Sequence, residues 1–203
     1  MRNQIKNLTV VLGFMGLLTA CTGSPPVHYY TLNLEAEAGS PRSIADQSSL
    51  AIAVDHISIP EVVDRPQMVL QSGSNQVRLV DDHRWAESLK SEIPRVVGDN
   101  LSRLLMTKMV WSYPQVAKGP VDYRVFIDIR RFESTRGSAV SIDTLWTIQP
   151  QSTDGAVPKT GRSIAQEPVV GQEFEAIAAA HSRALASISR EIADAIRDMM
   201  KTP

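Results

Sequence analysis

The sequence predicts an α+β fold, a single mostly antiparallel or mixed β-sheet with two long helices packed on one of its faces. Two observations lead to this prediction. Short segments with the composition and alternation of strands occur in two groups, and a long segment with helical periodicity follows each group. Because the order is strands, helix, strands, helix, we expect both helices on the same face of the sheet.

Residues 1–20 have the pattern of a secretion signal. Arg2 and Lys6 give a positive start, residues 8–19 form an uncharged and mostly apolar run, and small residues precede Cys21. The run is shorter than the roughly 20 residues that a spanning helix needs. The sequence Leu18-Thr19-Ala20-Cys21 resembles the lipobox of bacterial lipoproteins, which implies cleavage between Ala20 and Cys21 and lipidation of Cys21.

Cys21 is the only cysteine, so the chain has no intramolecular disulfide. The alternative interpretations are a secreted protein with a chance cysteine or a buried structural thiol. Each buried CH₂ contributes about 0.8 kcal/mol to membrane binding, so several acyl chains would hold the protein on the membrane. Thr22 occupies the position where Asp commonly retains a lipoprotein in the inner membrane. By resemblance to that sorting rule, we expect the outer membrane, on its periplasmic face.

The first group of strands follows a short lipidated tether, residues 21–28, which Pro25 and Pro26 stiffen. We assign residues 29–203 to one α+β domain. Residues 29–34 are rich in β-forming types, residues 35–49 lack periodicity and predict a loop, and residues 50–59 carry apolar side chains on both faces, as a central strand does. Ser72-Gly73-Ser74-Asn75 predicts a hairpin between strands 67–71 and 76–80.

The first helix is predicted from Trp85 to about Val110, because apolar residues recur there at three- and four-residue spacing. Pro94 should kink or divide this helix. Strands at 121–132 and 140–148 alternate apolar and polar side chains, which predicts an antiparallel hairpin with one wet face, and residues 162–170 predict a further strand. Residues 173–200 carry the clearest helical stripe.

The sequence contains none of the common catalytic motifs, so we expect a protein that is not an enzyme. The chain has 21 basic and 22 acidic residues without a basic cluster, which argues against nucleic-acid binding. A nucleophile elbow, a phosphate-binding loop and a zinc-protease motif are absent. The four histidines have no metal-ligand spacing, so we expect no metal and no cofactor. His181 lies on an apolar stripe, which predicts a satisfied, half-buried histidine rather than a metal ligand. Asp81 and Asp82 predict a solvated turn and helix cap.

The mature chain resembles the PqiC/YmbA-type outer-membrane lipoproteins, the auxiliary lipoproteins of ABC-type transport systems. The resemblance covers nearly all of it and rests on four features: Tyr29-Tyr30-Thr31-Leu32, Ile59-Pro60 with Asp64-Arg65-Pro66-Gln67, Arg84-Trp85-Ala86-Glu87-Ser88-Leu89, and an alanine-rich terminal helix. Ser88 stands where this family often has proline, a departure that concerns helix geometry.

The resemblance implies a lipid-anchored, non-catalytic component of an MCE-type intermembrane lipid transport system. Such a protein docks at the outer membrane, meets an MCE-domain protein that spans the periplasm, and contributes to envelope integrity. We expect the partner interface at Arg65, Met68, Arg84 and Trp85, near a strand edge that could pair with a partner or a second copy. The alternative for the two arginines is that they brace local turns. The alternative functions are an envelope-assembly lipoprotein, for lipopolysaccharide or outer-membrane protein insertion, and a lipid-anchored hydrolase.

Overall fold

The computed structural model describes residues 25–34, 49–115, 117, 119–151 and 157–201. In chain order these residues form β1 (His28–Tyr30), β2 (Ala51–Ser58), β3 (Gln67–Gly73), β4 (Gln76–Trp85), α2 (Leu89–Leu104), β5 (Met109–Ser112), β6 (Tyr123–Ser134), β7 (Ala139–Pro150), β8 (Lys159–Pro168) and α3 (Phe174–Lys201). The predicted signal, its cleavage site and Cys21 lie outside the described residues, as does nearly all of the predicted loop 35–49.

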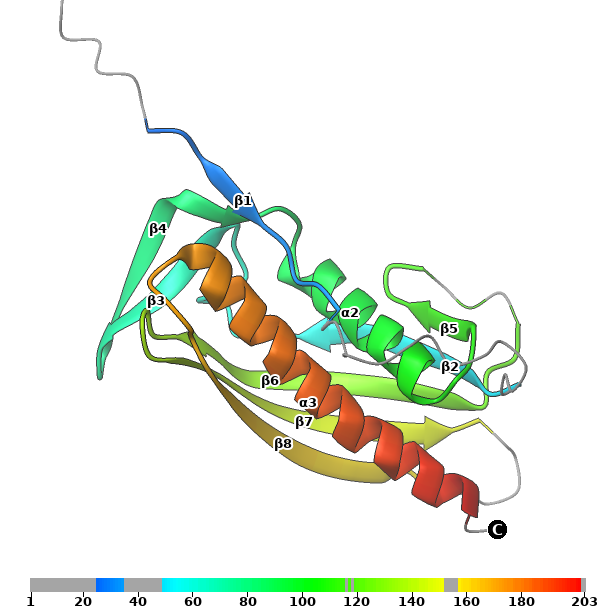
Figure 1. Cartoon of the computed structure of the whole chain (residues 1–203). Coiled ribbons are helices and arrows are strands. Elements are labelled where there is room, and N and C mark those ends of the chain that lie inside the picture. Colours follow the sequence, from blue (N-terminus) through cyan, green and yellow to red (C-terminus); the bar gives the residue numbers. More distant parts are fainter. Residues whose placement is uncertain (1–24, 35–48, 116, 118, 152–156, 202–203) are drawn as a thin grey trace, which may run out of the picture.

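The strands form two sheets, so the prediction of a single sheet is wrong. A five-stranded sheet has the order β5-β2-β6-β7-β8, and a three-stranded sheet has the order β1-β4-β3. Strand β2 has a neighbour on each side, as its two apolar faces predicted. This arrangement leaves no place beside β2 for the β3–β4 hairpin, which pairs with β1 instead and lies at one end of the molecule (Figure 1).

The five-stranded sheet is mixed. Strand β2 is parallel to both β5 and β6, whereas β6, β7 and β8 run antiparallel to one another. The predicted alternation in β6 holds, because Val125, Ile127 and Ile129 are buried while Asp128 and Arg130 are exposed. The hairpin of β6 and β7 therefore presents one face to the core and one to solvent.

Helix α2 begins at Leu89 and not at Trp85, and it ends before Val110. Pro94 lies inside it without dividing it. The helix stops where Met106 adopts a left-handed conformation (φ 54°), a common way for a helix to end. The residues after it form β5, a strand missed in the sequence because its apolar residues continue the helical spacing.

Helices α2 and α3 lie side by side on the same face of the five-stranded sheet (Figure 1). The main core joins them to both sheets: Leu101 of α2, Ile188 of α3, Ile142 of β7 and Met68 of β3 belong to one buried cluster. Ala51 and Ala53, on the opposite face of β2, pack with Val121 in a second, small cluster. Within the part of the chain that the structure describes, neither helix combines enough length and apolarity to cross a membrane.

Candidate functional site

Three segments that are far apart in the sequence meet around one hollow of about 430 Å³. Tyr29 comes from β1, residues 64–66 from the loop before β3, and residues 84–88 from the end of β4 and the turn into α2. These segments belong to three of the four features on which the family resemblance rests. The sequence placed two of them on either side of a hairpin but did not predict that the first strand would join them.

The hairpin itself brings these segments together. Because β3 and β4 are antiparallel, the start of β3 lies opposite the end of β4, where Gln67 pairs with Arg84. The Trp85 N–H donates to the Pro66 carbonyl at 2.7 Å, and the Ala86 N–H donates to the Tyr30 carbonyl at 2.8 Å. Strand β1 runs parallel to β4, with Tyr29 opposite Arg84. The hollow therefore lies where the first strand of the domain, β1, joins the β3–β4 hairpin.

A stack of aromatic rings fixes β1 to the start of α3. The His83 ring stacks on Phe174 with centroids 3.6 Å apart and on His28 at 5.1 Å. The Tyr30 hydroxyl and His83 Nδ1 are 2.7 Å apart, which is hydrogen-bonding distance. Burial lowers the pKa of His83, which favours the neutral ring in this stack. The sequence prediction did not include this contact, which depends on the pairing of β1 with β4.

The four residues predicted as a partner interface have different environments. Met68 is 1% exposed and Trp85 is 5% exposed, so their side chains belong to the core and cannot meet a partner. Trp85 packs edge-on against Phe132 and His181. Arg84 Nε donates to the Asp81 carbonyl at 2.8 Å, and both residues lie within β4, so the bond is local but braces a strand and not a turn. The turn and helix cap predicted at Asp81 and Asp82 are therefore wrong, since α2 begins only after Ser88. Arg65 is exposed at the rim of the hollow.

Residues 31–34 continue from β1 as a strap across the two helices. The Leu32 N–H donates to Glu92 Oε1 at 2.8 Å, and Arg95 Nη2 donates to the Leu32 carbonyl at 3.3 Å. The Asn33 N–H donates to Ser182 Oγ of α3 at 3.1 Å. A strap bonded to both helices holds the entering chain against the folded body.

Glu92 was missed in the sequence although a signal for it exists. Its position, three residues after Leu89 and four before Val96, places it on the apolar face of α2. The carboxyl group is fully buried, and Oε2 has no hydrogen-bond partner among the described residues. Burial raises the pKa of Glu92 to about 7, although the Leu32 N–H and Arg95 both lower it.

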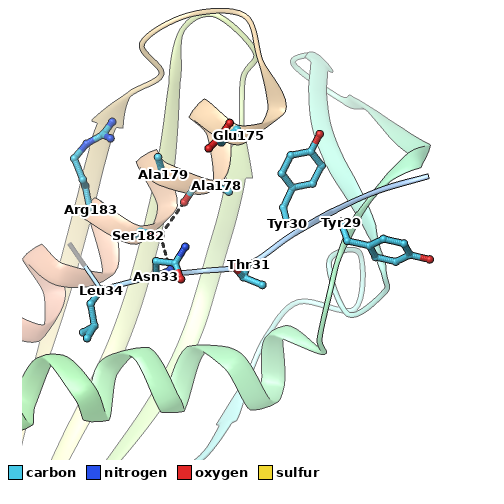
Figure 2. Close-up of a pocket in the computed structure, with 10 residues that line it drawn as sticks. All are labelled: Tyr29, Tyr30, Thr31, Asn33, Leu34, Glu175, Ala178, Ala179, Ser182 and Arg183. Carbon is cyan, nitrogen blue, oxygen red and sulfur yellow. Dashed lines mark hydrogen bonds between the residues drawn. The ribbon is translucent and has the colours of Figure 1, made fainter. Parts of the chain in front are cut away.

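A larger groove, about 550 Å³, lies between the strap and α3 (Figure 2). Small side chains of α3, Ala178, Ala179 and Ser182, form its helical wall. Ser182 Oγ also donates to the Ala178 carbonyl at 2.9 Å, so its hydroxyl is engaged with backbone groups. Arg183 at the rim donates to the Pro168 carbonyl at 2.6 Å and pairs with Glu167. The groove offers shape and hydrogen-bonding groups rather than a nucleophile activated by a base.

The histidine predicted to be satisfied and half-buried is buried more deeply than expected, and its Nδ1 has no hydrogen-bond partner among the described residues. His181 is fully buried, its Nε2 lies 2.7 Å from Ser134 Oγ, and it stacks on Phe132 with centroids 3.9 Å apart. Burial lowers the pKa of His181 to about 3. Among the described residues, no three His, Cys, Asp or Glu side chains gather as metal ligands do.

Comparisons with known proteins agree with this architecture. The model of the family described as "ABC-type transport auxiliary lipoprotein component" matches residues 30–193. No curated protein matches the chain. The crystal structure of an uncharacterised protein has a TM-score of 0.68 at 17% identity, covering 85% of this chain and 99% of its own.

A second crystal structure, of a Xanthomonas campestris protein in the family DUF330, has a TM-score of 0.63 at 18% identity. The match covers 86% of this chain and 96% of that protein. At these identities the two structures show a shared fold. Because the family model spans most of the sequence, the chain belongs to the ABC-type transport auxiliary lipoprotein family.

Proposed function

We propose that this protein is a lipid-anchored, non-catalytic auxiliary component of an MCE-type intermembrane lipid transport system. In this proposal, Cys21 carries the acyl chains, the protein resides at the periplasmic face of the outer membrane, and its folded part docks an MCE-domain protein. Family membership supports the coarser part, an auxiliary lipoprotein of a transport system in the cell envelope. The open edge of β3, beside the junction of the three motif segments, supports docking.

The edge of β3 has the properties of a protein-binding surface. Strand β3 is the last strand of its sheet, and among the described residues no strand pairs with its outer side, so this edge is a template for an added strand. A hollow of about 140 Å³ lies beside it, lined in part by Val62, Val69 and Val77. Val62 is 41% and Val77 is 44% exposed, an apolar strip that a bound segment would cover.

Arg65 lies at the start of this edge, in the loop that leads into β3. Its side chain is exposed, whereas among the other predicted interface residues Arg84 is half-buried and Met68 and Trp85 are buried. A guanidinium group beside an apolar strip suits a partner that offers a carboxylate next to apolar side chains. The docking surface is therefore Arg65, Val62, Val77 and the β3 edge.

The proposal predicts that Arg65→Glu combined with Val77→Glu abolishes co-purification with the MCE-domain protein. Both substitutions place charge on the docking surface and leave the core untouched. The matched control is Val157→Glu, because Val157 is 78% exposed and lies outside this surface. Circular dichroism should show native helix content in all variants, and detergent resistance of cells should fall only with the double variant.

Two results would contradict the proposal at different levels. If the folded double variant still captures the MCE-domain protein and restores detergent resistance, the β3 edge is not the interface. If the wild-type protein never captures an MCE-domain protein, the transport function itself is wrong. Capture of an outer-membrane assembly protein instead would favour the envelope-assembly alternative.

A further inference from the structure

Tyr29 is an exposed aromatic residue between the groove beside α3 and the hollow at the motif junction. It lines both the groove beside α3 and the hollow at the motif junction. Its side chain is 64% exposed, and in Figure 2 the ring points away from α3. Its neighbour Tyr30, by contrast, is fixed by His83. Val27, just before β1, is 39% exposed. Two exposed apolar side chains thus flank the point where the chain enters the fold.

The position of Tyr29 in the sequence limits its distance from the lipid anchor. It lies eight positions after Cys21, and a trans chain extends at most about 3.5 Å per residue, so Tyr29 lies within roughly 28 Å of the acylated cysteine. Pro25 and Pro26 favour an extended chain in this interval. Strand β1 lies at the end of the molecule opposite the last turn of α3 (Figure 1). With the anchor on Cys21, as proposed above, the end that carries Tyr29 is the end nearest the membrane.

The chemistry of this end suits a lipid surface. Tyrosine is enriched at membrane interfaces, because its ring enters the apolar region while its hydroxyl meets water and headgroups. Val27 adds apolar area beside it. Arg84, opposite Tyr29 in the sheet register, lines the adjoining hollow and offers a cation to lipid phosphates.

We propose that Val27 and Tyr29 rest in the headgroup region of the membrane that holds the Cys21 anchor, so that the molecule stands on its β1 edge. This inference rests on the proposed lipidation of Cys21. Strands β1 and β3 are opposite edges of the three-stranded sheet. With β1 on the lipid, the β3 edge stays open to a protein partner, and one small sheet connects the membrane contact with the docking surface.

Spin labels on the full-length lipidated protein test this orientation. Cys21 is the only native cysteine and its thiol is acylated in this proposal, so Val27→Cys, Tyr29→Cys and Val157→Cys each provide one free thiol. The control Val157 precedes β8, whose first residue Lys159 pairs with Asp198 in the last turns of α3, at the opposite end of the molecule. The labelled proteins are reconstituted in vesicles of phosphatidylethanolamine and phosphatidylglycerol.

Collision rates of each label with oxygen, which concentrates in lipid, and with a water-soluble nickel chelate give its depth. The proposal predicts an oxygen-to-nickel ratio several-fold higher at positions 27 and 29 than at 157. Because Val27 lies outside any strand, its variant keeps the test valid if Tyr29→Cys disturbs β1. An acylated protein with equal ratios at all three positions overturns this inference alone. Mass spectrometry that finds no acyl chain on Cys21 overturns the proposed anchor and this inference together.

Discussion

Glu92 shows how one residue can tie the tether to the core at an energetic cost. Its carboxyl group binds the Leu32 N–H in a position without solvent, and one of its oxygens has no partner among the described residues. A buried carboxylate is penalised unless its hydrogen bonds are complete. The raised pKa of about 7 reflects this penalty and makes the strap sensitive to pH.

The sign of this sensitivity follows from the direction of the shift. The pKa of Glu92 is higher in the folded than in the unfolded chain. The contribution of the protonated side chain to the free energy of unfolding is therefore fully present below about pH 4.5 and is lost as the pH rises through 7. We predict that Glu92→Gln keeps the bond to Leu32 and removes this loss, which amounts to roughly 3 kcal/mol at most by pH 8. Urea unfolding at pH 5 and pH 8 measures it.

The matched control is Glu87→Gln, which removes an exposed carboxyl group near the same helix end and should leave the pH dependence almost unchanged. If Glu92→Gln destabilises the protein equally at both pH values, the carboxylate carries no burial penalty and the prediction is wrong.

At the scale of the elements, close cross-strand packing decides which residues a strand tolerates. Trp146 of β7 lies opposite Gly161 of β8, and its indole N–H donates to Ser163 Oγ at 2.9 Å. A Cβ at position 161 would overlap the indole ring. Glycine is ordinarily a weak strand residue, and here it makes room for an aromatic ring that covers its backbone.

We predict that Gly161→Ala lowers the free energy of unfolding by about 1–3 kcal/mol, because the buried indole must move against its neighbours. The control is Gly73→Ala at the β3–β4 turn, where a Cβ meets Gln76 at an ordinary 3.6 Å. Thermal unfolding and the near-ultraviolet circular dichroism of tryptophan report the change. Equal stability of the two variants would show that the ring relaxes without cost.

At the scale of the whole molecule, the two sheets differ in what they carry besides the core. Both sheets and the two helices contribute to the main core, and the three-stranded sheet also carries the entering chain, three of the family motifs and the β3 edge. A force that pulls on the lipid anchor would act first on β1 and on the strap, residues 31–34. The strap bonds of Leu32 and Asn33 to α2 and α3 oppose such strain.

The proposed lipid anchor lies in the N-terminal segment, outside the described residues. We predict that Cys21→Ser yields an unlipidated precursor that still carries residues 1–20, because lipidation of the cysteine precedes cleavage in lipobox proteins. Mass spectrometry and fractionation measure the two effects. Normal cleavage with membrane retention in this variant would contradict the assignment.

Thr22→Asp is the matched variant for sorting, since it leaves Cys21 intact. With acylation unchanged, this variant should move the protein from the outer-membrane to the inner-membrane fraction. A wild-type protein that already fractionates with inner-membrane markers would contradict the proposed location.

The sequence by itself determined the local elements and the family. The alternation in residues 121–132 and 140–148 and the helical stripe in residues 173–200 are properties of neighbouring residues, so the sequence alone predicts β6, β7 and α3. Most of the strands and the last helix were predicted close to their observed positions, whereas the first helix was predicted too long at both ends. Of the candidate interface, only Arg65 kept the exposure that the prediction required.

Only the tertiary structure decided how these elements combine. Trp85 reads as the start of a helix from its spacing to Leu89, but the parallel pairing of β1 with residues 83–85 extends β4 through it. Met68 reads as an edge residue, but the hairpin folds against the main core and buries it. Pairing and burial depend on contacts between residues far apart in the chain. Local periodicity does not encode these contacts, which is why the two sheets and the junction of the motifs appeared only in the folded structure.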